Sequence, residues 1–254
     1  HVLLVPMRRL HSGTGEVAAL PRLGAVETEL PGGSLYYHIV PVRGTTLALM
    51  LKGGFDYQAV GINSEEKSTF LSGPLRLNPR LNNDGSEMTM DDVIKHGFHW
   101  RSIGIHAPQS AASIYFSMNE GDQTQHYLAP STFVPKELGL KVKWENLLEV
   151  KSDQGEEPQN IRFHPDLPIA YAVYKNHYEI FMLDHLAEKI ERLANTEKPG
   201  SFAFDYPAGL ANVEDIHFYT DIVNPSTGET TLRVAAVVGA EDGSKQIIWL
   251  DDSH

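Results

Sequence analysis

The chain has 254 residues, of which 41% are hydrophobic, and this length can bury a sizeable core in one large or two small domains. It contains no cysteine, which excludes disulfides, thiolate metal sites and cysteine nucleophiles. The formal net charge is −12, so a basic face that binds nucleic-acid phosphates is not expected. No apolar run approaches the roughly 18 to 20 residues that span a bilayer.

Both ends of the chain are interpreted as cut, because it begins with His1 and ends at His254 directly after "WLDDS". The opening "HVLLVPM" is too short for the core of a signal peptide. The sequence holds no usable N-glycosylation sequon, since Asn224-Pro225-Ser226 is spoiled by its proline. The compartment stays open, although the lack of cysteine and of a sequon favours the cytoplasm.

Short apolar runs rich in Val, Ile, Tyr and Phe, punctuated by Gly and Pro, predict strands along most of the chain. A phrase of three strands recurs. In the third copy it reads "NIRFHPD", "PIAYAVYKN" and "YEIFMLD", and in the fourth "DIHFYTD", "TLRVAAVVGA" and "KQIIWLD". The four copies in chain order cover residues 34–63, 102–130, 159–184 and 215–251.

Each copy has a further strand candidate beside it. "HVLLVPM" and "GAVETEL" precede the first copy, "LKVKWENLLEV" precedes the third and "AEKIERLAN" precedes the fourth. The last segment is also compatible with an amphipathic helix that carries Leu186, Ile190 and Leu193 on one face. Its place in the repeat favours a strand.

A recurring unit of four antiparallel strands is typical of a β-propeller blade. A single blade exposes two apolar faces, and neighbouring blades cover both, which explains near-continuous apolar runs such as residues 170–173. A two-sheet sandwich would show more alternation and no recurring phrase. We therefore predict an all-β fold, a β-propeller with four clear four-stranded antiparallel blades and a partial N-terminal one. It is expected to form a single domain over residues 1–254, with a long inter-blade loop at about 64–99.

The third copy has the pattern "P-x-x-I-x-F-H-P-D…A-Y-A-V…Y-E-I-F-x-L-D". It thereby resembles the repeat of lactonase-type β-propellers, which include propeller 6-phosphogluconolactonases and muconate-lactonizing enzymes. The resemblance covers residues 149–184 best. It implies a propeller fold, and an activity on a small lactone or sugar acid in the axial funnel. In that family the starts of the inner strands often carry Arg or His, and here the matching positions are Arg101-Ser102, Gln159-Asn160 and Glu214-Asp215.

Three histidines stand at the same register of their blades, namely His38, His106 and His164. Axial histidines would bind a transition metal such as iron or copper. In the fourth copy, however, His217 falls on the position of Arg162, and Tyr219 takes the histidine position. We therefore favour a structural role, in which these histidines hydrogen-bond the corner between the first and second strands, and no cofactor is expected.

The axial funnel is the usual ligand position in propellers, and polar residues at the starts of the first strands are the best candidates for it. In a hydrolase, Glu214 or Asp215 would activate water, and Arg101 would hold an acidic group or the developing oxyanion. His99, Asn160 and Gln159 are the expected ligand-binding residues.

Two functions from different classes therefore stay open, with a His-ligated metalloenzyme as a third. One is a lactonase-like hydrolase or isomerase with a small-molecule ligand. The other is a non-catalytic propeller that serves as an interaction platform for a protein partner. Fold alone does not choose between them, and neither involves nucleic acid or a membrane span.

Overall fold

In the computed structural model, strands make up most of the described residues. The structure describes residues 2–4, 26–28, 36–42, 47–52, 56–63, 68–73, 75–78, 85–106, 111–120, 122–134, 136–165, 167–207, 210–224, 227, 229–240 and 242–250. Within these ranges the one α-helix is α1 (Met90–Lys95), and one 3-10 turn covers Trp144–Asn146. The predicted all-β fold is therefore confirmed. No helix in the described ranges has the length and apolar character needed to cross a membrane.

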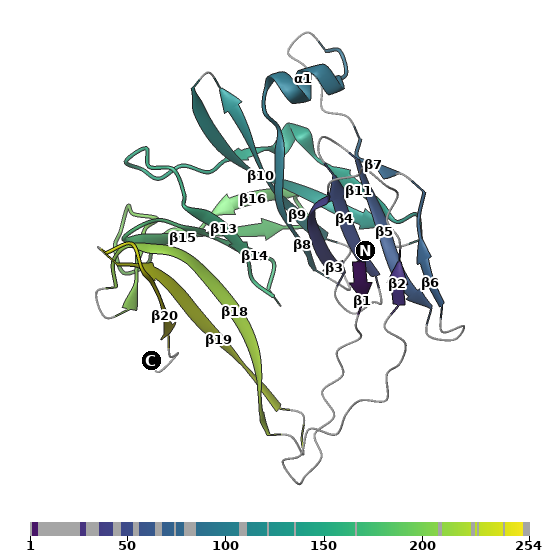
Figure 1. The fold of residues 1–254 in the computed structure, drawn as a ribbon. Helices are drawn as coiled ribbons and strands as arrows, with labels where there is room; N and C mark the ends of the chain where they lie inside the picture. Colours follow the sequence, from purple (N-terminus) through teal and green to yellow (C-terminus); the bar gives the residue numbers. More distant parts are fainter. Residues whose placement is uncertain are drawn as a thin grey trace.

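Four antiparallel sheets follow one another along the chain, and we call them the first to fourth blades (Figure 1). The first blade consists of β3 (Tyr36–Val42), β4 (Leu47–Lys52), β5 (Asp56–Asn63) and β6 (Ser68–Leu71). The second consists of β8 (His99–His106), β9 (Ala111–Glu120), β10 (Gln123–Val134) and β11 (Gly139–Val142). The third consists of β13 (Asn160–Phe163), β14 (Ile169–Val173), β15 (His177–Asp184) and β16 (Lys189–Arg192).

In its described part the fourth blade has three strands, β18 (Val213–Asn224), β19 (Glu229–Gly239) and β20 (Lys245–Leu250). The four predicted copies thus coincide with the first three strands of the four blades. A separate two-stranded sheet pairs β1 (Val2–Leu4) with β2 (Val26–Thr28), where the partial N-terminal blade was predicted.

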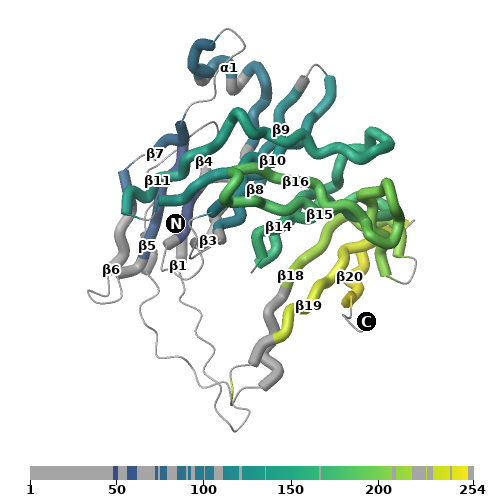
Figure 2. Tube along the Cα trace, turned by 180° about the vertical axis from the view of Figure 1, so that it is seen from behind, coloured from purple at the N-terminus to yellow at the C-terminus, as the bar shows by residue number. Residues whose placement is uncertain are grey.

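The blades are arranged around their first strands. β3 contacts β8, β8 contacts β13, and β13 contacts β18, so the first strand of every blade is the inner one. Figures 1 and 2 show the sheets fanning out in chain order, with the fourth blade at the opposite end from the first. Consecutive meander sheets that pack side by side through their inner strands have β-propeller architecture.

Apolar side chains fill the space between neighbouring blades. Between the second and third blades, for example, Tyr115 and Leu128 pack against Ile161, Phe181 and Ile190. The inner strands approach each other so closely there that a Cβ on Gly104 of β8 would lie 2.7 Å from Phe163 Cγ of β13. A residue without a side chain is therefore needed at position 104.

The segment expected to be a long loop at about 64–99 contains ordered elements. Its beginning forms β6, the fourth strand of the first blade, and β7 (Leu75–Arg76), which pairs with β5. Its end forms α1, which Thr89 caps because its Oγ1 accepts a hydrogen bond from the backbone N–H of Asp92 at 3.2 Å. By contrast, the strand preferred over a helix for "AEKIERLAN" is confirmed, because β16 covers Lys189–Arg192.

Candidate functional site

Asp215 lies at the centre of a polar cluster between the inner strands of the third and fourth blades. Its Oδ1 accepts a hydrogen bond from Arg162 Nε at 2.8 Å, and its Oδ2 is bound by the other arm of the same guanidinium. Asn160 Nδ2 donates to Oδ2 at 3.3 Å, and His217 Nε2 lies 3.4 Å from that oxygen. The structure therefore brings together two of the predicted site residues, Asn160 and Asp215.

Electrostatics explain the stability of this cluster. The hydrogen bonds from Arg162 to Asp215 are the main cause of a raised Arg162 pKa, and burial opposes it. A fork-shaped guanidinium that binds both oxygens of a carboxylate is among the strongest polar contacts in proteins. Arg162 therefore compensates the charge of Asp215 and binds both of its oxygens.

Gln159 and Glu214 lie on a different cavity, at the end of the blades where these inner strands begin. This polar cavity of 510 Å³ is lined by Gln159, Lys175, Asn212, Val213, Glu214, Gly239 and Ala240. Glu214 Oε2 forms a salt bridge of 2.6 Å with Lys245 Nζ, so its charge is compensated within the fourth blade. Both predicted residues are therefore accessible from one polar cavity, although Glu214 binds a lysine there.

Arg101 and His99 lie on β8 in the second blade, and both are exposed. Arg101 stands at a register shift between Trp100 and Ser102, and its Nε donates to Ser117 Oγ at 3.0 Å in the same blade. The three predicted catalytic residues thus bind different partners: Arg101 binds Ser117, Glu214 binds Lys245, and Asp215 binds Arg162.

A tyrosine–histidine pair, in which Tyr115 is buried and His126 half-buried, lies in the second blade. The hydroxyl of Tyr115 is 2.8 Å from Nδ1 of His126. Burial raises the pKa of Tyr115 to about 12, although the positive charges of Arg101 and Arg162 act in the opposite direction. Burial also lowers the pKa of His126, so its neutral form is favoured.

The three candidate metal histidines can be placed only in part. His164 is buried, and its Nδ1 accepts a hydrogen bond from the backbone N–H of Leu167 at 3.0 Å. It therefore holds the corner between β13 and β14, as the structural interpretation predicted. The side chains of His38 and His106 lie outside the described residues. In the described part of the chain no group of three His, Asp or Glu residues is placed to hold a metal ion.

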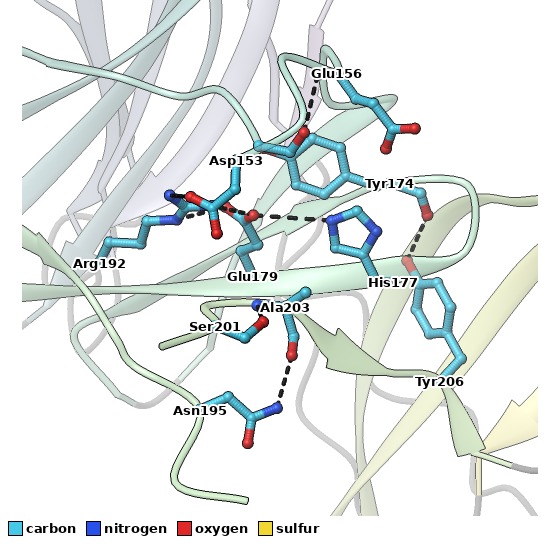
Figure 3. Close-up of polar contacts among 11 residues, drawn as sticks. Asp153, Glu156, Tyr174, His177, Glu179, Arg192, Asn195, Ser201, Ala203 and Tyr206 are labelled. Atoms are coloured by element: carbon cyan, nitrogen blue, oxygen red, sulfur yellow. Dashed lines mark hydrogen bonds and ion pairs between the residues drawn. The ribbon is translucent and has the colours of Figure 1, made fainter. Parts of the chain in front are cut away.

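A second polar network lies at the outer edge of the third blade (Figure 3). Glu179 of β15 is 1% exposed, and Arg192 of β16 binds both of its carboxylate oxygens. Arg192 also donates to Asp153 Oδ1 at 2.7 Å, and His177 Nε2 lies 3.8 Å from Glu179 Oε1. Burial lowers the pKa of Arg192, but the hydrogen bonds and charges of Glu179 and Asp153 more than offset this, so the pKa is raised.

The same network borders a polar cavity of 270 Å³. Its lining residues are Ser152, Asp153, Gln154, Asn176, His177, Glu179, Ser201, Ala203 and Asp205. One wall is held by Asn195, whose Nδ2 donates to the carbonyl of Ala203 at 2.6 Å. Tyr174 stacks on His177 with ring centroids 4.6 Å apart, which completes the packing. Arg192 binds Glu179 and Asp153 at once, so the network connects β15, β16 and the segment that carries Asp153.

The outer strand of the fourth blade has a different character. Among the described residues β20 pairs with β19 alone, whereas β5, β10 and β15 at the same position in the other blades each have strands on both sides. Two large apolar side chains on β20 are exposed, Ile247 at 67% and Trp249 at 54%. We call the side of β20 that no described strand pairs with, together with Ile247 and Trp249, the β20 edge.

An apolar pocket of 150 Å³ adjoins the β20 edge. It is lined by Tyr171, Tyr178, Tyr206, Pro207, Ile216, Phe218, Val234 and Leu250. These residues come from the third and fourth blades, and the pocket is continuous with the apolar interface between the two. Four of the eight are aromatic, and none carries a charge. We call it the aromatic pocket.

Sequence reasoning missed Arg162, the Glu179–Arg192 pair and the β20 edge. The sequence did contain a signal for Arg162, because Arg162 and His217 occupy equivalent positions in the aligned third and fourth copies. Both side chains contact Asp215. Glu179 and Arg192 carry no such signal, since a charged residue on a strand usually faces solvent.

Known proteins show limited similarity to this chain. No family model matches the chain, and no curated protein matches it. Among solved structures, the chain is similar to Saccharomyces cerevisiae Sqt1, with a TM-score of 0.40 and 10% sequence identity. The likeness covers 80% of this chain and 43% of Sqt1, so the chain spans less than half of that protein.

Proposed function

We propose that this propeller is a non-catalytic platform that binds a protein partner, and that the β20 edge is its binding surface. The observation that carries the proposal is the exposed apolar strand at the end of the fourth blade. Its backbone is paired on one side only within the described residues, and Ile247 is 67% exposed beside it.

Physical principles favour a protein partner for such a surface. An edge strand presents a row of backbone donors and acceptors that an extended segment of another chain can pair with. Natural edges are commonly protected by charges, prolines or bulges, and the middle of β20, "QIIW", has none of these. Exposed Trp is also typical of residues that dominate binding energy at interfaces.

The polar clusters favour a catalytic function less. Asp215 and Glu179 are each bound by an arginine, and Glu214 is bound by Lys245. A carboxylate that acts as a base or nucleophile needs an oxygen available to the substrate or to water. These three carboxylates instead connect strands and blades.

Photo-crosslinking from position 247 tests the proposal. In one sample a photoreactive benzophenone amino acid replaces Ile247, and in a second sample it replaces Leu186. Leu186 is a suitable control because it is a large apolar residue, 87% exposed, on a turn of the third blade. We expect a discrete protein adduct from position 247 and none from position 186.

The adduct must also depend on the chemistry of the edge. In this experiment the benzophenone amino acid replaces Trp249. Ile247→Lys is then expected to abolish crosslinking to the same partner, while Leu186→Lys leaves it unchanged. Melting temperatures of both variants are measured to exclude unfolding. Equal capture by the two variants, or the absence of any adduct specific to position 247, overturns the proposal.

A further inference from the structure

The polar cavity of 510 Å³ is formed by the third and fourth blades, and backbone hydrogen bonds hold its walls in place. We call it the inter-blade cavity. Val213 N–H donates to the carbonyl of Lys175 at 2.9 Å, which joins the start of β18 to the turn between β14 and β15. Gly239 N–H donates to the carbonyl of Asn212 at 3.0 Å, which joins the end of β19 to the same wall. The side chains on these walls therefore project from a fixed backbone.

Two carboxamide side chains, those of Gln159 and Asn212, line the inter-blade cavity. Neither side chain makes a hydrogen bond within the described residues. Asn212 has a left-handed backbone with a φ of 60°, which glycine adopts without steric cost and Asn more readily than most other residues. Each carboxamide offers two N–H donors and one acceptor oxygen to a molecule in the cavity.

Lys175 gives the inter-blade cavity a positive charge that no carboxylate among the described residues pairs with. The other charged residue on the walls is Glu214, and its Oε2 is bound by Lys245 at 2.6 Å. Glu214 Oε1 lies against Gly239, where a Cβ would be only 2.6 Å away, and both residues line the cavity. The charge of Glu214 is thus compensated by Lys245, while Lys175 adds an excess positive charge.

The chemistry of these walls complements the main chain of a peptide. Among the described residues, Val213 and Ala240 are the apolar side chains on the walls and none is aromatic, whereas pockets for small organic molecules are lined mostly by apolar and aromatic groups. Peptide N–H groups donate to carboxylate and carboxamide oxygens, and peptide carbonyls accept from carboxamide N–H groups. The negative charge that a main chain itself carries is its terminal carboxylate, which complements Lys175.

We propose that the inter-blade cavity binds the carboxy-terminal residue of a peptide, with its carboxylate at Lys175 and its amide N–H at Glu214 Oε1. The carboxamides of Gln159 and Asn212 bind the carbonyl that precedes this residue. Capture of a terminal carboxylate is an established mode of peptide recognition. The inference goes beyond the proposed function, because the cavity lies apart from the exposed side chains of the β20 edge.

The course of β20 bears on the source of the peptide end. The strand begins with Lys245 beside the inter-blade cavity and carries the chain away from it, to Leu250 about 16 Å along the strand. The residues that directly follow β20 therefore start at a distance from the cavity, and the peptide end is supplied as a separate molecule in the test.

Matched peptides test the role of the terminal charge. Acetyl-Gly-Gly-Gly with a free carboxylate, and the same peptide with a terminal amide, are titrated into isotope-labelled protein, and the backbone amide NMR signals of Val213 and Gly239 report binding. We expect the amide peptide to bind at least about tenfold more weakly, because a hydrogen bond to a charged group accounts for roughly that factor. Acetyl-Gly-Asp-Gly-amide carries its negative charge on a side chain, and it should bind as weakly as the amide peptide.

Two protein variants test the walls of the cavity. Lys175→Gln should weaken binding of the carboxylate peptide about tenfold, with Lys136→Gln on an exposed turn of the second blade as the matched control. Asn212→Gly removes one carboxamide and should weaken binding about threefold. Since glycine adopts the left-handed backbone freely, the melting temperature of Asn212→Gly should not fall, and weaker binding by this variant then reports the lost side chain.

Three outcomes overturn the inference. Equal affinity of the carboxylate and amide peptides, or equal binding by Lys175→Gln and Lys136→Gln, removes the recognition of a terminal charge. Binding of the aspartate peptide as tightly as the carboxylate peptide assigns the cavity to acidic side chains. Displacement of the carboxylate peptide by an equal concentration of acetate marks the cavity as a general anion site. The photo-adduct at position 247 is measured separately, so the proposed function can stand or fail without this inference.

Discussion

Arg162 and Asp215, 53 residues apart in the chain, join the inner strands of the third and fourth blades through both nitrogens of one guanidinium edge and both oxygens of one carboxylate. Asp215 is only 17% exposed, so its charge is largely withdrawn from water. The pair therefore connects two blades that otherwise meet mainly through apolar side chains.

Replacing Arg162 by methionine keeps the apolar stem and removes the charge. We expect Arg162→Met to lower the free energy of unfolding by about 2 kcal/mol, because Asp215 loses its charged hydrogen bonds. Urea unfolding followed by circular dichroism measures the change, with exposed Lys136→Met as the matched control. In a double-mutant cycle with Asp215→Asn, additive effects would show that the two side chains are not coupled.

Glu179→Gln removes the charge that Arg192 binds. Breaking a buried ion pair leaves the partner charge uncompensated, and we expect a loss of about 3 kcal/mol in the free energy of unfolding. Glu191→Gln on the neighbouring strand is the control, because Glu191 is half-exposed and pairs with Lys189 at the surface. Its effect should stay within about 0.5 kcal/mol. Similar losses for the two variants would contradict a buried, structurally important Glu179.

Gly104→Ala tests the close approach of β8 and β13. The added methyl would lie 2.7 Å from Phe163 Cγ, so we expect a loss of about 2 kcal/mol from overpacking. Gly73→Ala is the control, since a Cβ there meets no atom within 4 Å. Combining Gly104→Ala with Phe163→Leu should recover part of the loss. If the single variant unfolds at the same urea concentration as the original chain, the inner strands do not approach this closely.

Alkaline pH should destabilise the fold through Tyr115. Its pKa is raised from 10.0 to about 12 in the folded chain, so its stabilising contribution is complete below pH 10 and is lost as pH rises toward 12. The expected slope is about 1.4 kcal/mol per pH unit for this group. Urea midpoints at pH 9, 10 and 11 measure it, and Tyr115→Phe should have a shallower slope because one buried hydroxyl is removed. Parallel slopes would exclude Tyr115 as the source.

Local patterns were sufficient to predict the strands of the four blades. "IAYAV" and "YEIFMLD" are β-rich, bounded by turn residues, and they became β14 and β15 because neighbouring strands and blades cover their apolar faces. The corner at His164 was also predictable, since a residue before proline is biased toward an extended backbone. The long polar segment before His99 was harder, because β6, β7 and α1 are short and are stabilised by strands elsewhere in the chain.

The candidate site was predictable only where strand starts define it. Asn160 and Asp215 were expected at the inner strands and do meet, but Arg101 and Glu214 bind residues of their own blades. Which polar residues pair depends on the lateral placement of one blade against the next, and strand propensity carries no information about this. A lactonase-like activity stays a prediction, and the carboxylate pairs do not favour it.

The sequence by itself determined that the chain is an all-β repeat, because strand alternation, turn residues and the recurring phrase are local properties of the backbone and its side chains. Only the tertiary structure decided that Arg162 neutralises Asp215, that Glu179 is buried, and that β20 presents Ile247 at an edge. These features follow from contacts between segments distant in sequence, and their energies depend on burial and on partner geometry that no local pattern specifies.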